Sequence, residues 1–105
     1  MPSVEEYREL LAHHGLLRSA NLPPLTAHTM VRGLTFDSRE SSPGTLFVCK
    51  GAHFVPGYLL DALSRGAVAY VAEQAIPEAG ETPSLLVTDI RKAMAVLGNA
   101  FYGEA

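Results

Sequence analysis

Two short polar stretches contain the side chains of this sequence that are best suited to bind a ligand. The first is Asp37-Ser38-Arg39, which ends a strand-like run from Met30 to Phe36. The second is Lys50-Gly51, which ends another apolar run from Thr45 to Cys49. A serine hydroxyl can donate a hydrogen bond to a phosphate or base oxygen, and a glycine lets backbone N–H groups approach an anion closely. Both stretches could therefore meet a ligand at one edge of a sheet, where α/β folds bind their ligands.

The Asp37-Ser38-Arg39 motif also has a purely structural interpretation. Asp and Ser at a strand end can hold a turn through side-chain to backbone hydrogen bonds. An Arg can clamp a neighbouring carboxylate in a bidentate pair as readily as it can meet a ligand. From the residues alone the structural role is favoured for so short a motif. For Arg39 we expect that role, with Asp37 or another carboxylate as its partner.

Other reactive residue types give no catalytic pattern. Cys49 lies in an apolar strand, and because free cysteines are commonly buried we expect a core residue and not a nucleophile. The four histidines show no metal-ligand spacing with this cysteine or with one another. No GxxxxGKS or GxxxxGKT phosphate-binding loop is present, and no cluster of carboxylates replaces it. We therefore expect no catalytic residue, no metal and no ATP site in these 105 residues.

Alternating strands and helices must position the two polar stretches. Apolar runs predict strands over 31–36, 46–49, 67–72 and 85–87, the third buried on both faces of a sheet. Helical spacing predicts helices over 4–13 and 58–65, and a last helix capped by Asp89. The segment 16–27 is expected to be an irregular connector because Pro23 and Pro24 disfavour a helix. This order predicts a small layered Rossmann-like α/β domain, whose mostly parallel or mixed sheet is flanked by helices.

Helix ends are expected at specific residues. Ser3 and Glu6 form a capping-box pattern at the start of the first helix. Gly15, Gly66 and Gly103 follow the three helical patterns, where a left-handed glycine is a common stop.

The composition is that of one ordinary globular domain, with 48% hydrophobic and 18% charged residues. No apolar run approaches the roughly 20 residues that span a bilayer, and the acidic amino-terminal stretch is not a secretory signal. The formal charge is −3, with eight Lys and Arg against eleven Asp and Glu and no basic stripe for nucleic acid. The single cysteine fits a reducing compartment. We expect a cytoplasmic protein with neither a membrane nor a nucleic-acid partner.

In combination, these motifs resemble the N-terminal domain of the Mur ligases. The matching segments are LTFDSRESSPGTLFVCKGAHF, DALSRGAVAYVAE and VTDIRKAMAVLGNAFYG, so the resemblance runs from about Val31 to the last residues. Mur ligases are ATP-dependent amide ligases that build the peptide stem of peptidoglycan on a UDP-N-acetylmuramoyl carrier. Within the family the chain is most similar to the tripeptide synthetases, which add the third stem residue. The alternatives are the ligase that adds D-alanyl-D-alanine and a non-catalytic binding module of the same fold.

The resemblance implies a binding site for the UDP moiety of UDP-N-acetylmuramoyl-L-alanyl-D-glutamate. The residues that contact UDP in the family align with Phe36 and Ser38, and with Ala52, His53 and Phe54. The next residues of this chain, Val-Pro-Gly at 55–57, replace the Asp-Gly-His that is common in the family. This difference leaves open any role that the family's Asp or His would have.

The resemblance also implies how the work is divided within a complete ligase. In the family, ATP and Mg²⁺ bind a central domain, and a C-terminal domain chooses the amino acid that is added. Residues 1–105 therefore correspond to the substrate-binding domain alone. By themselves they are expected to be inactive.

Overall fold

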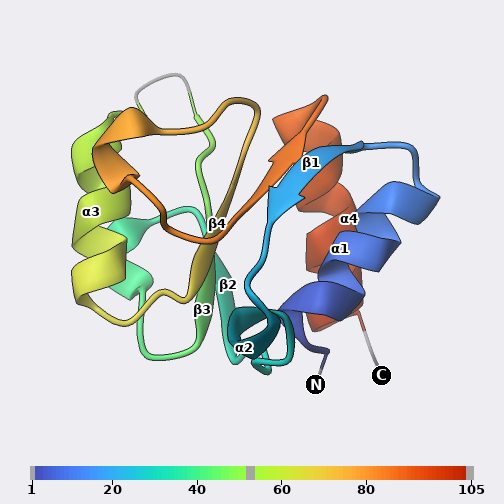
Figure 1. Cartoon of the computed structure of the whole chain (residues 1–105), viewed down its shortest axis with the longest axis horizontal. Helices are drawn as coiled ribbons and strands as arrows, with labels where there is room; N and C mark the ends of the chain where they lie inside the picture. The colour runs from blue at the N-terminus through green and yellow to red at the C-terminus, as the bar shows by residue number, and fades with distance from the viewer. Residues whose placement is uncertain (1, 52–53, 104–105) are drawn as a thin grey trace.

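The computed structural model describes residues 2–51 and 54–103. Its elements in chain order are α1 (Val4–His13), β1 (Leu17–Asn21), α2 (Pro24–Ala27), β2 (Gly33–Thr35), the 3₁₀ turn η1 (Ser38–Glu40), β3 (Thr45–Val48), α3 (Pro56–Ser64), β4 (Ala69–Ala72), the 3₁₀ turn η2 (Pro77–Ala79), β5 (Ser84–Val87) and α4 (Ile90–Tyr102). Figure 1 shows the sheet between two helical layers, with α3 on one side and α1 and α4 on the other.

The five strands form one mixed sheet in the order β1-β5-β4-β3-β2. Strands β2, β3, β4 and β5 are parallel, and β1 pairs antiparallel with β5 at one edge. The predicted α/β fold with a mixed sheet is therefore confirmed. Because the four parallel strands point the same way, the segments that follow them all emerge where the carboxyl ends of the strands meet. This is the ligand-binding edge of such sheets.

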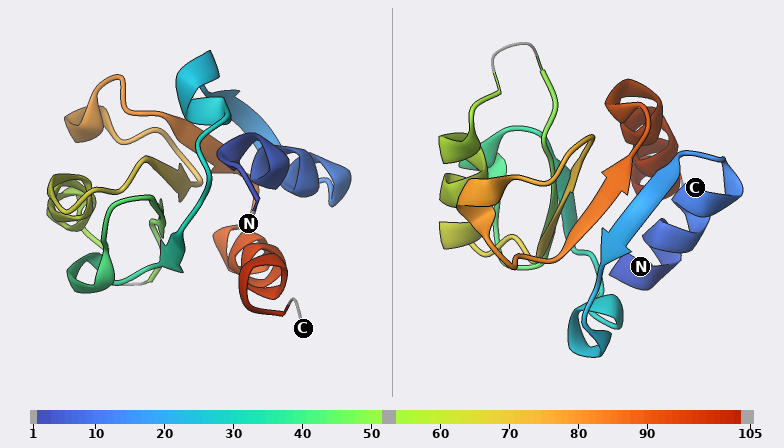
Figure 2. Two further views of the ribbon diagram at one scale, coloured as in Figure 1. Left: turned by 90° about the horizontal axis from the view of Figure 1, so that it is seen from below. Right: turned by 45° about the horizontal axis from the view of Figure 1, so that its top comes forward.

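Apolar side chains cover both faces of this sheet. One core cluster joins α1 and α4 to the first face, and its buried members include Tyr7, Leu11, Val71 and Leu97. The second cluster joins α3 to the opposite face and contains Phe47, Leu59, Ala62, Tyr70 and Ala72. Figure 2 shows α1 and α4 side by side, away from α3. Both β3 and β4 are buried along their whole length, and for β4 the continuous apolar run predicts this burial.

The predicted caps begin the two long helices. The Ser3 hydroxyl accepts a hydrogen bond from the Glu6 N–H at 3.2 Å, and the Glu6 carboxylate accepts from the Ser3 N–H at 2.8 Å. Asp89 Oδ1 accepts from the N–H groups of Arg91 and Lys92, both at 3.0 Å. Each helix therefore has orphan N–H groups satisfied by side chains close in sequence.

The prediction that residues 16–27 form an irregular connector is wrong. The segment contains strand β1 and the one-turn helix α2. Most of β1 is exposed at the sheet edge, so its sequence lacks the apolar alternation by which a strand is recognised. Helix α2 has Pro24 at its first position, where the missing N–H breaks no helical hydrogen bond.

The boundaries of the third helix were only partly predicted. Helix α3 starts at Pro56, two residues before the expected start, again with proline in the first turn. Gly66 follows this helix with φ +110°, and Gly15 follows α1 with φ +71°, so both predicted glycine stops are confirmed. Within α3, Leu59 is fully buried, whereas Leu60 is 43% exposed.

The predicted left-handed stop at Gly103 is wrong. Gly103 has φ −85° and ψ −2°, in the right-handed region. Its N–H still donates to the Asn99 carbonyl at 2.9 Å, so the backbone continues the helical turn there. In the part of the chain that the structure describes, none of the helices is long and apolar enough to cross a membrane.

Candidate nucleotide-binding site

A surface hollow of about 620 Å³ lies where the chain leaves β2, between η1 and α3. Its lining consists of Phe36, Asp37, Ser38 and Arg39 on one side and Tyr58 and Asp61 of α3 on the other. The polar motif that the sequence indicated therefore forms one wall of the hollow. The opposite wall comes from a helix about 20 residues further along the chain.

Asp37 and Arg39 hold each other at the start of η1. Asp37 Oδ1 accepts from the Arg39 backbone N–H at 3.0 Å and from Arg39 Nε at 3.1 Å, and Asp37 Oδ2 accepts from Arg39 Nη2 at 2.9 Å. These hydrogen bonds lower the pKa of the Asp37 carboxyl and raise the pKa of the Arg39 guanidinium. The predicted pairing of Arg39 with an internal carboxylate is confirmed.

Thr35 and Glu40 tighten the same turn. The Thr35 hydroxyl accepts from the Asp37 N–H at 3.0 Å and donates to Glu40 Oε1 at 3.2 Å. Ser38 is thereby held in η1 with only 8% of its surface exposed. Within residues 2–51 and 54–103, no hydrogen bond is found for the Ser38 hydroxyl. That hydroxyl is therefore a candidate donor to a bound molecule.

Phe36 links the hollow to the end of β3. Its side chain is 53% exposed, which is high for a phenylalanine, and it lines the hollow. The Lys50 ammonium lies 4.8 Å from the centre of the Phe36 ring. No carboxylate among the described residues forms an ion pair with Lys50. An exposed ring beside such a cation can meet a base and a phosphate of the same ligand.

The second predicted stretch is described only in part. Ala52 and His53 lie outside the described residues. The Phe54 side chain is partly buried against the core cluster of α3, and its ring meets Tyr58 edge-on, with 6.3 Å between the ring centres and 68° between their planes. Phe54 is not among the described residues that line the hollow, and it supports the wall formed by Tyr58.

Tyr58 and Asp61 were not predicted from the sequence as residues of the site. Tyr58 is 48% exposed in the first turn of α3. An exposed aromatic residue outside the apolar stripe of a helix is the only local signal that could have indicated it. Asp61 is paired with Arg65 through a hydrogen bond of 3.1 Å from Arg65 Nε, so locally it resembles any solvent-facing helical ion pair.

Comparison with known proteins relates this geometry to a family. The chain is 47% identical over 102 residues to the UDP-N-acetylmuramyl-tripeptide synthetase of Limosilactobacillus reuteri, a match covering 97% of this chain and 18% of that protein. It is also 47% identical over 91 residues to the enzyme of that name from Ligilactobacillus salivarius, covering 87% of this chain and 17% of that protein. By sequence, the chain is a relative of the Mur ligases. It is most similar to the tripeptide synthetases among them.

The fold comparison agrees with that relationship. MurF from Acinetobacter baumannii matches 92% of this chain and 20% of its own with a TM-score of 0.68 and 22% identity, which shows a shared fold. No protein-family model matches the chain. This Mur ligase relative spans only about 18% of the length of the first curated protein that it matches.

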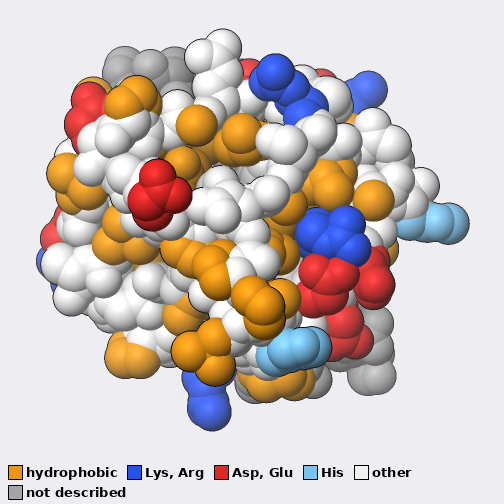
Figure 3. Space-filling view, in the orientation of Figure 1, with side chains coloured by type: hydrophobic (Ala, Val, Ile, Leu, Met, Phe, Trp, Pro, Cys, Tyr) orange, Lys and Arg blue, Asp and Glu red, His pale blue; other side chains and the backbone are white. Residues whose placement is uncertain are grey.

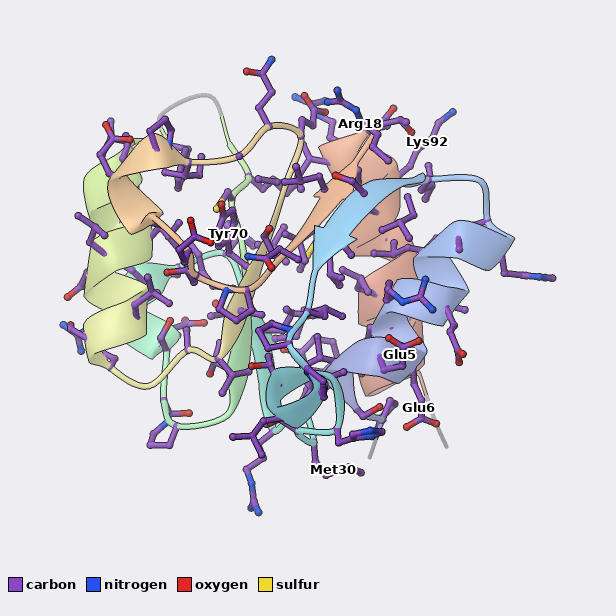
Figure 4. The ribbon with its side chains drawn as sticks, viewed as in Figure 1. Glu5, Glu6, Arg18, Met30, Tyr70 and Lys92 are labelled. Carbon is purple, nitrogen blue, oxygen red and sulfur yellow. The ribbon has the colours of Figure 1, made fainter. Side chains whose placement is uncertain are left out.

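At the other end of the same side of the sheet, side chains of this chain already occupy the N–H groups at the start of α4. Glu73 Oε2 accepts from the Ile90 N–H at 2.8 Å, and Asp89 occupies the next two N–H groups of α4. Arg18 donates to the Glu73 carbonyl oxygen, and in the view of Figure 4 it lies at the same end of the molecule as Lys92 of α4. The start of α4 therefore has little capacity left for an anion. The hollow beside η1 is the better site.

Among the described residues, the large apolar side chain with the highest exposed fraction lies away from the hollow. Leu25 in α2 is 86% exposed, and nearby Met30 is 43% exposed. Figure 3 shows apolar side chains gathered around this region, at the end of the sheet where β2 begins. Because parallel α/β sheets bind ligands at the opposite end, this surface is not part of the candidate site.

Cys49 does not supply a nucleophile. Burial raises the pKa of its thiol to about 12, so it stays a protonated thiol at neutral pH. Searching the described residues for three or more His, Cys, Asp or Glu side chains that could hold a metal ion finds no such group. What the site has is an exposed ring, a hydroxyl and a nearby cation, which are binding groups.

Proposed function

We propose that this chain is the N-terminal substrate-binding domain of a cytoplasmic UDP-N-acetylmuramyl-tripeptide synthetase. It binds UDP-N-acetylmuramoyl-L-alanyl-D-glutamate by the UDP end, for the addition of the third residue of the peptidoglycan stem. The observation that carries the proposal is the hollow itself. Phe36 and Ser38 border it together, in a chain that is 47% identical to proteins of that name.

Each binding group has a distinct part. The Ser38 hydroxyl donates to an oxygen of the nucleotide, and the Phe36 ring stacks on the base. The Lys50 ammonium and the backbone N–H groups near Gly51 bind the diphosphate. Ala52, His53 and Phe54 complete the contacts by their alignment with the UDP-binding residues of the family.

The charges near the hollow are compatible with an anionic ligand although the chain carries a net charge of −3. Both carboxylates that line the hollow are paired with arginines, Asp37 with Arg39 and Asp61 with Arg65. Lys50 has no such carboxylate partner among the described residues and adds a positive charge beside Phe36. A diphosphate therefore finds its attraction on the Lys50 side.

The residues described in the structure do not fit ATP or Mg²⁺. They include no group of acidic, His or Cys side chains that could hold a metal, and the sequence has no phosphate-binding loop. We assign both to the remainder of a full-length ligase. The contribution of this chain is to hold the UDP end, which fixes the position of the distant reactive carboxylate.

A nuclear magnetic resonance titration with UDP tests the proposal. Backbone resonances of Ser38 and residues 52–54 are expected to shift first and to saturate. Shifts confined to α4 or to residues 73–83 contradict the site. If the chain binds no UDP-linked muramoyl dipeptide at millimolar concentration, the non-catalytic alternative is favoured.

An activity assay tests the division of labour. We expect the 105-residue chain to turn over no ATP in the presence of the UDP-linked dipeptide and an amino acid. Measurable ATP turnover by the pure chain contradicts this expectation.

A further inference from the structure

Two exposed aromatic rings border the same hollow from different elements. Phe36 comes from the end of β2, and Tyr58 comes from the first turn of α3. Their side chains are 53% and 48% exposed, although most large apolar side chains of this fold are buried. A flat, partly apolar ligand in the hollow can pack against both half-exposed rings and remove their apolar surface from water.

Each ring is supported on one side by a neighbour. Phe54 meets Tyr58 edge-on, at 6.3 Å between ring centres. The Lys50 ammonium lies 4.8 Å from the centre of the Phe36 ring. These contacts restrict both rings before any ligand arrives, which lowers the entropy lost on binding.

The two carboxylates that line the hollow are each paired with an arginine. Asp37 is bound by Arg39 and Asp61 by Arg65, at 2.9 and 3.1 Å. Both carboxylates of the lining are therefore already neutralised by guanidinium groups. A neutral flat ring fits this part of the hollow better than a phosphate does, because a phosphate would have to compete with both carboxylates for the arginines.

We propose that Tyr58 is a second stacking residue, which holds the uracil base on the α3 side of the hollow while Phe36 holds it on the β2 side. The proposal rests on the proposed function, because that function supplies a uridine nucleotide as the ligand. It adds to base recognition a residue of the α3 wall, opposite Phe36. Since the contact is to the base, it acts equally on uridine and on UDP.

Calorimetric titration of uridine, UMP and UDP into three variants tests the proposal. Tyr58→Leu keeps an apolar side chain and removes the ring, so we expect all three ligands to bind about five- to 150-fold more weakly, the range measured for loss of one base–aromatic stack. Tyr58→Phe keeps the ring and is expected to bind within about twofold of wild type. The matched control is Leu60→Ala, which changes an exposed residue of the same helix that is not among the described lining residues.

A structural readout makes the test independent of variant stability. With UDP bound to the wild-type chain, nuclear Overhauser effects are expected between the uracil H5 and H6 protons and the ring protons of Tyr58. Their absence in a saturated complex overturns the proposal. So does an unchanged affinity of Tyr58→Leu for uridine, and in both cases the proposed function stands. If the wild-type chain binds none of the three ligands, the proposed function fails as well.

Discussion

The Lys50 ammonium lies 4.8 Å from the centre of the Phe36 ring, which joins the ends of neighbouring strands β3 and β2. One strand end therefore delivers an aromatic surface and the other delivers the positive charge beside it. A nucleotide needs both, since its base is flat and its phosphates are anionic. Under the proposed function, this pair gives a chain with a net negative charge a local attraction for a nucleotide.

Replacing Lys50 by Met should distinguish the contribution of the phosphates to binding from that of the base. Lys50→Met keeps a long apolar side chain and removes the charge, so UDP should bind about tenfold more weakly, near 1.4 kcal/mol, while uridine is unaffected. Titration calorimetry of both ligands at low and high salt measures this, and the salt dependence of UDP binding should fall in the variant. Lys92→Met, on the opposite side of the sheet, is the control. Equal losses for uridine and UDP would place Lys50 against the base.

Ser38→Ala should weaken UDP binding by roughly 0.5–1.5 kcal/mol, the net value of one hydrogen bond. Thermal unfolding should hardly change, because the structure describes no hydrogen bond that the Ser38 hydroxyl would lose. Calorimetry and a melting curve on the same preparation check both parts. A large drop in melting temperature with unchanged affinity would mean that the serine holds the turn.

Arg39→Ala should act on its partner carboxylate. In the folded chain Arg39 lowers the pKa of Asp37 through side-chain hydrogen bonds, so the pKa of Asp37 should rise toward 3.8 in the variant. A pH titration of the Asp37 carboxyl resonance measures the change. UDP affinity should fall less than in Ser38→Ala. The reverse order of affinities would show that Arg39, which is 81% exposed, contacts the ligand itself.

Tyr7 should make the fold sensitive to alkaline pH. Its side chain is 1% exposed, its hydroxyl has no hydrogen-bond partner among the described residues, and burial raises its pKa from 10.0 to about 12. Because the unfolded chain releases this proton first, the stability of the neutral folded form is complete below pH 10 and is lost as the pH rises toward 12. Tyr7→Phe should raise the free energy of unfolding by about 1 kcal/mol at pH 7 and remove this loss. Denaturant unfolding at pH 7 and pH 11 measures both, and a destabilised variant would show that the hydroxyl has a partner.

Gly66 should not tolerate a side chain. It has φ +110°, and a Cβ atom there would lie 2.6 Å from Pro43 Cα. Gly66→Ala should therefore lower the free energy of unfolding by about 1–3 kcal/mol. The control is Gly98→Ala inside α4, where a Cβ meets no atom within 4 Å and alanine favours the helix by roughly 0.5–1 kcal/mol. Opposite signs for the two variants in denaturant unfolding are the expected result.

Local patterns were sufficient to predict most of the fold. The capping box at Ser3 and Glu6 and the continuous apolar run of β4 each reflect interactions within a few residues or burial on both faces. Strand β1 was missed because it is mostly exposed and becomes a strand only by pairing with β5, from Leu17 opposite Val87 to Asn21 opposite Ser84. That pairing depends on residues far along the chain, which local periodicity cannot report.

One wall of the candidate site could likewise be predicted from local sequence and the other could not. Its β2 wall follows from a motif in which Asp37 and Arg39 interact two residues apart, so a local reading was adequate. The α3 wall depends on how η1 packs against that helix. The sequence around Tyr58 contains no local pattern that predicts its position opposite the end of β2.

The antiparallel pairing of β1 with β5 also determines when folding can finish during synthesis. Among the described strands, β1 is made before the other four and its partner β5 after them, so β1 cannot pair in the sheet until Val87 has emerged. The parallel pairs β2–β3 and β3–β4 can form earlier, before β5 has been made. Because chains are made at about 5–20 residues per second, α1 and β1 remain without their sheet for several seconds. In the living cell, α1 and β1 are therefore accessible to chaperones and proteases until β5 has been made.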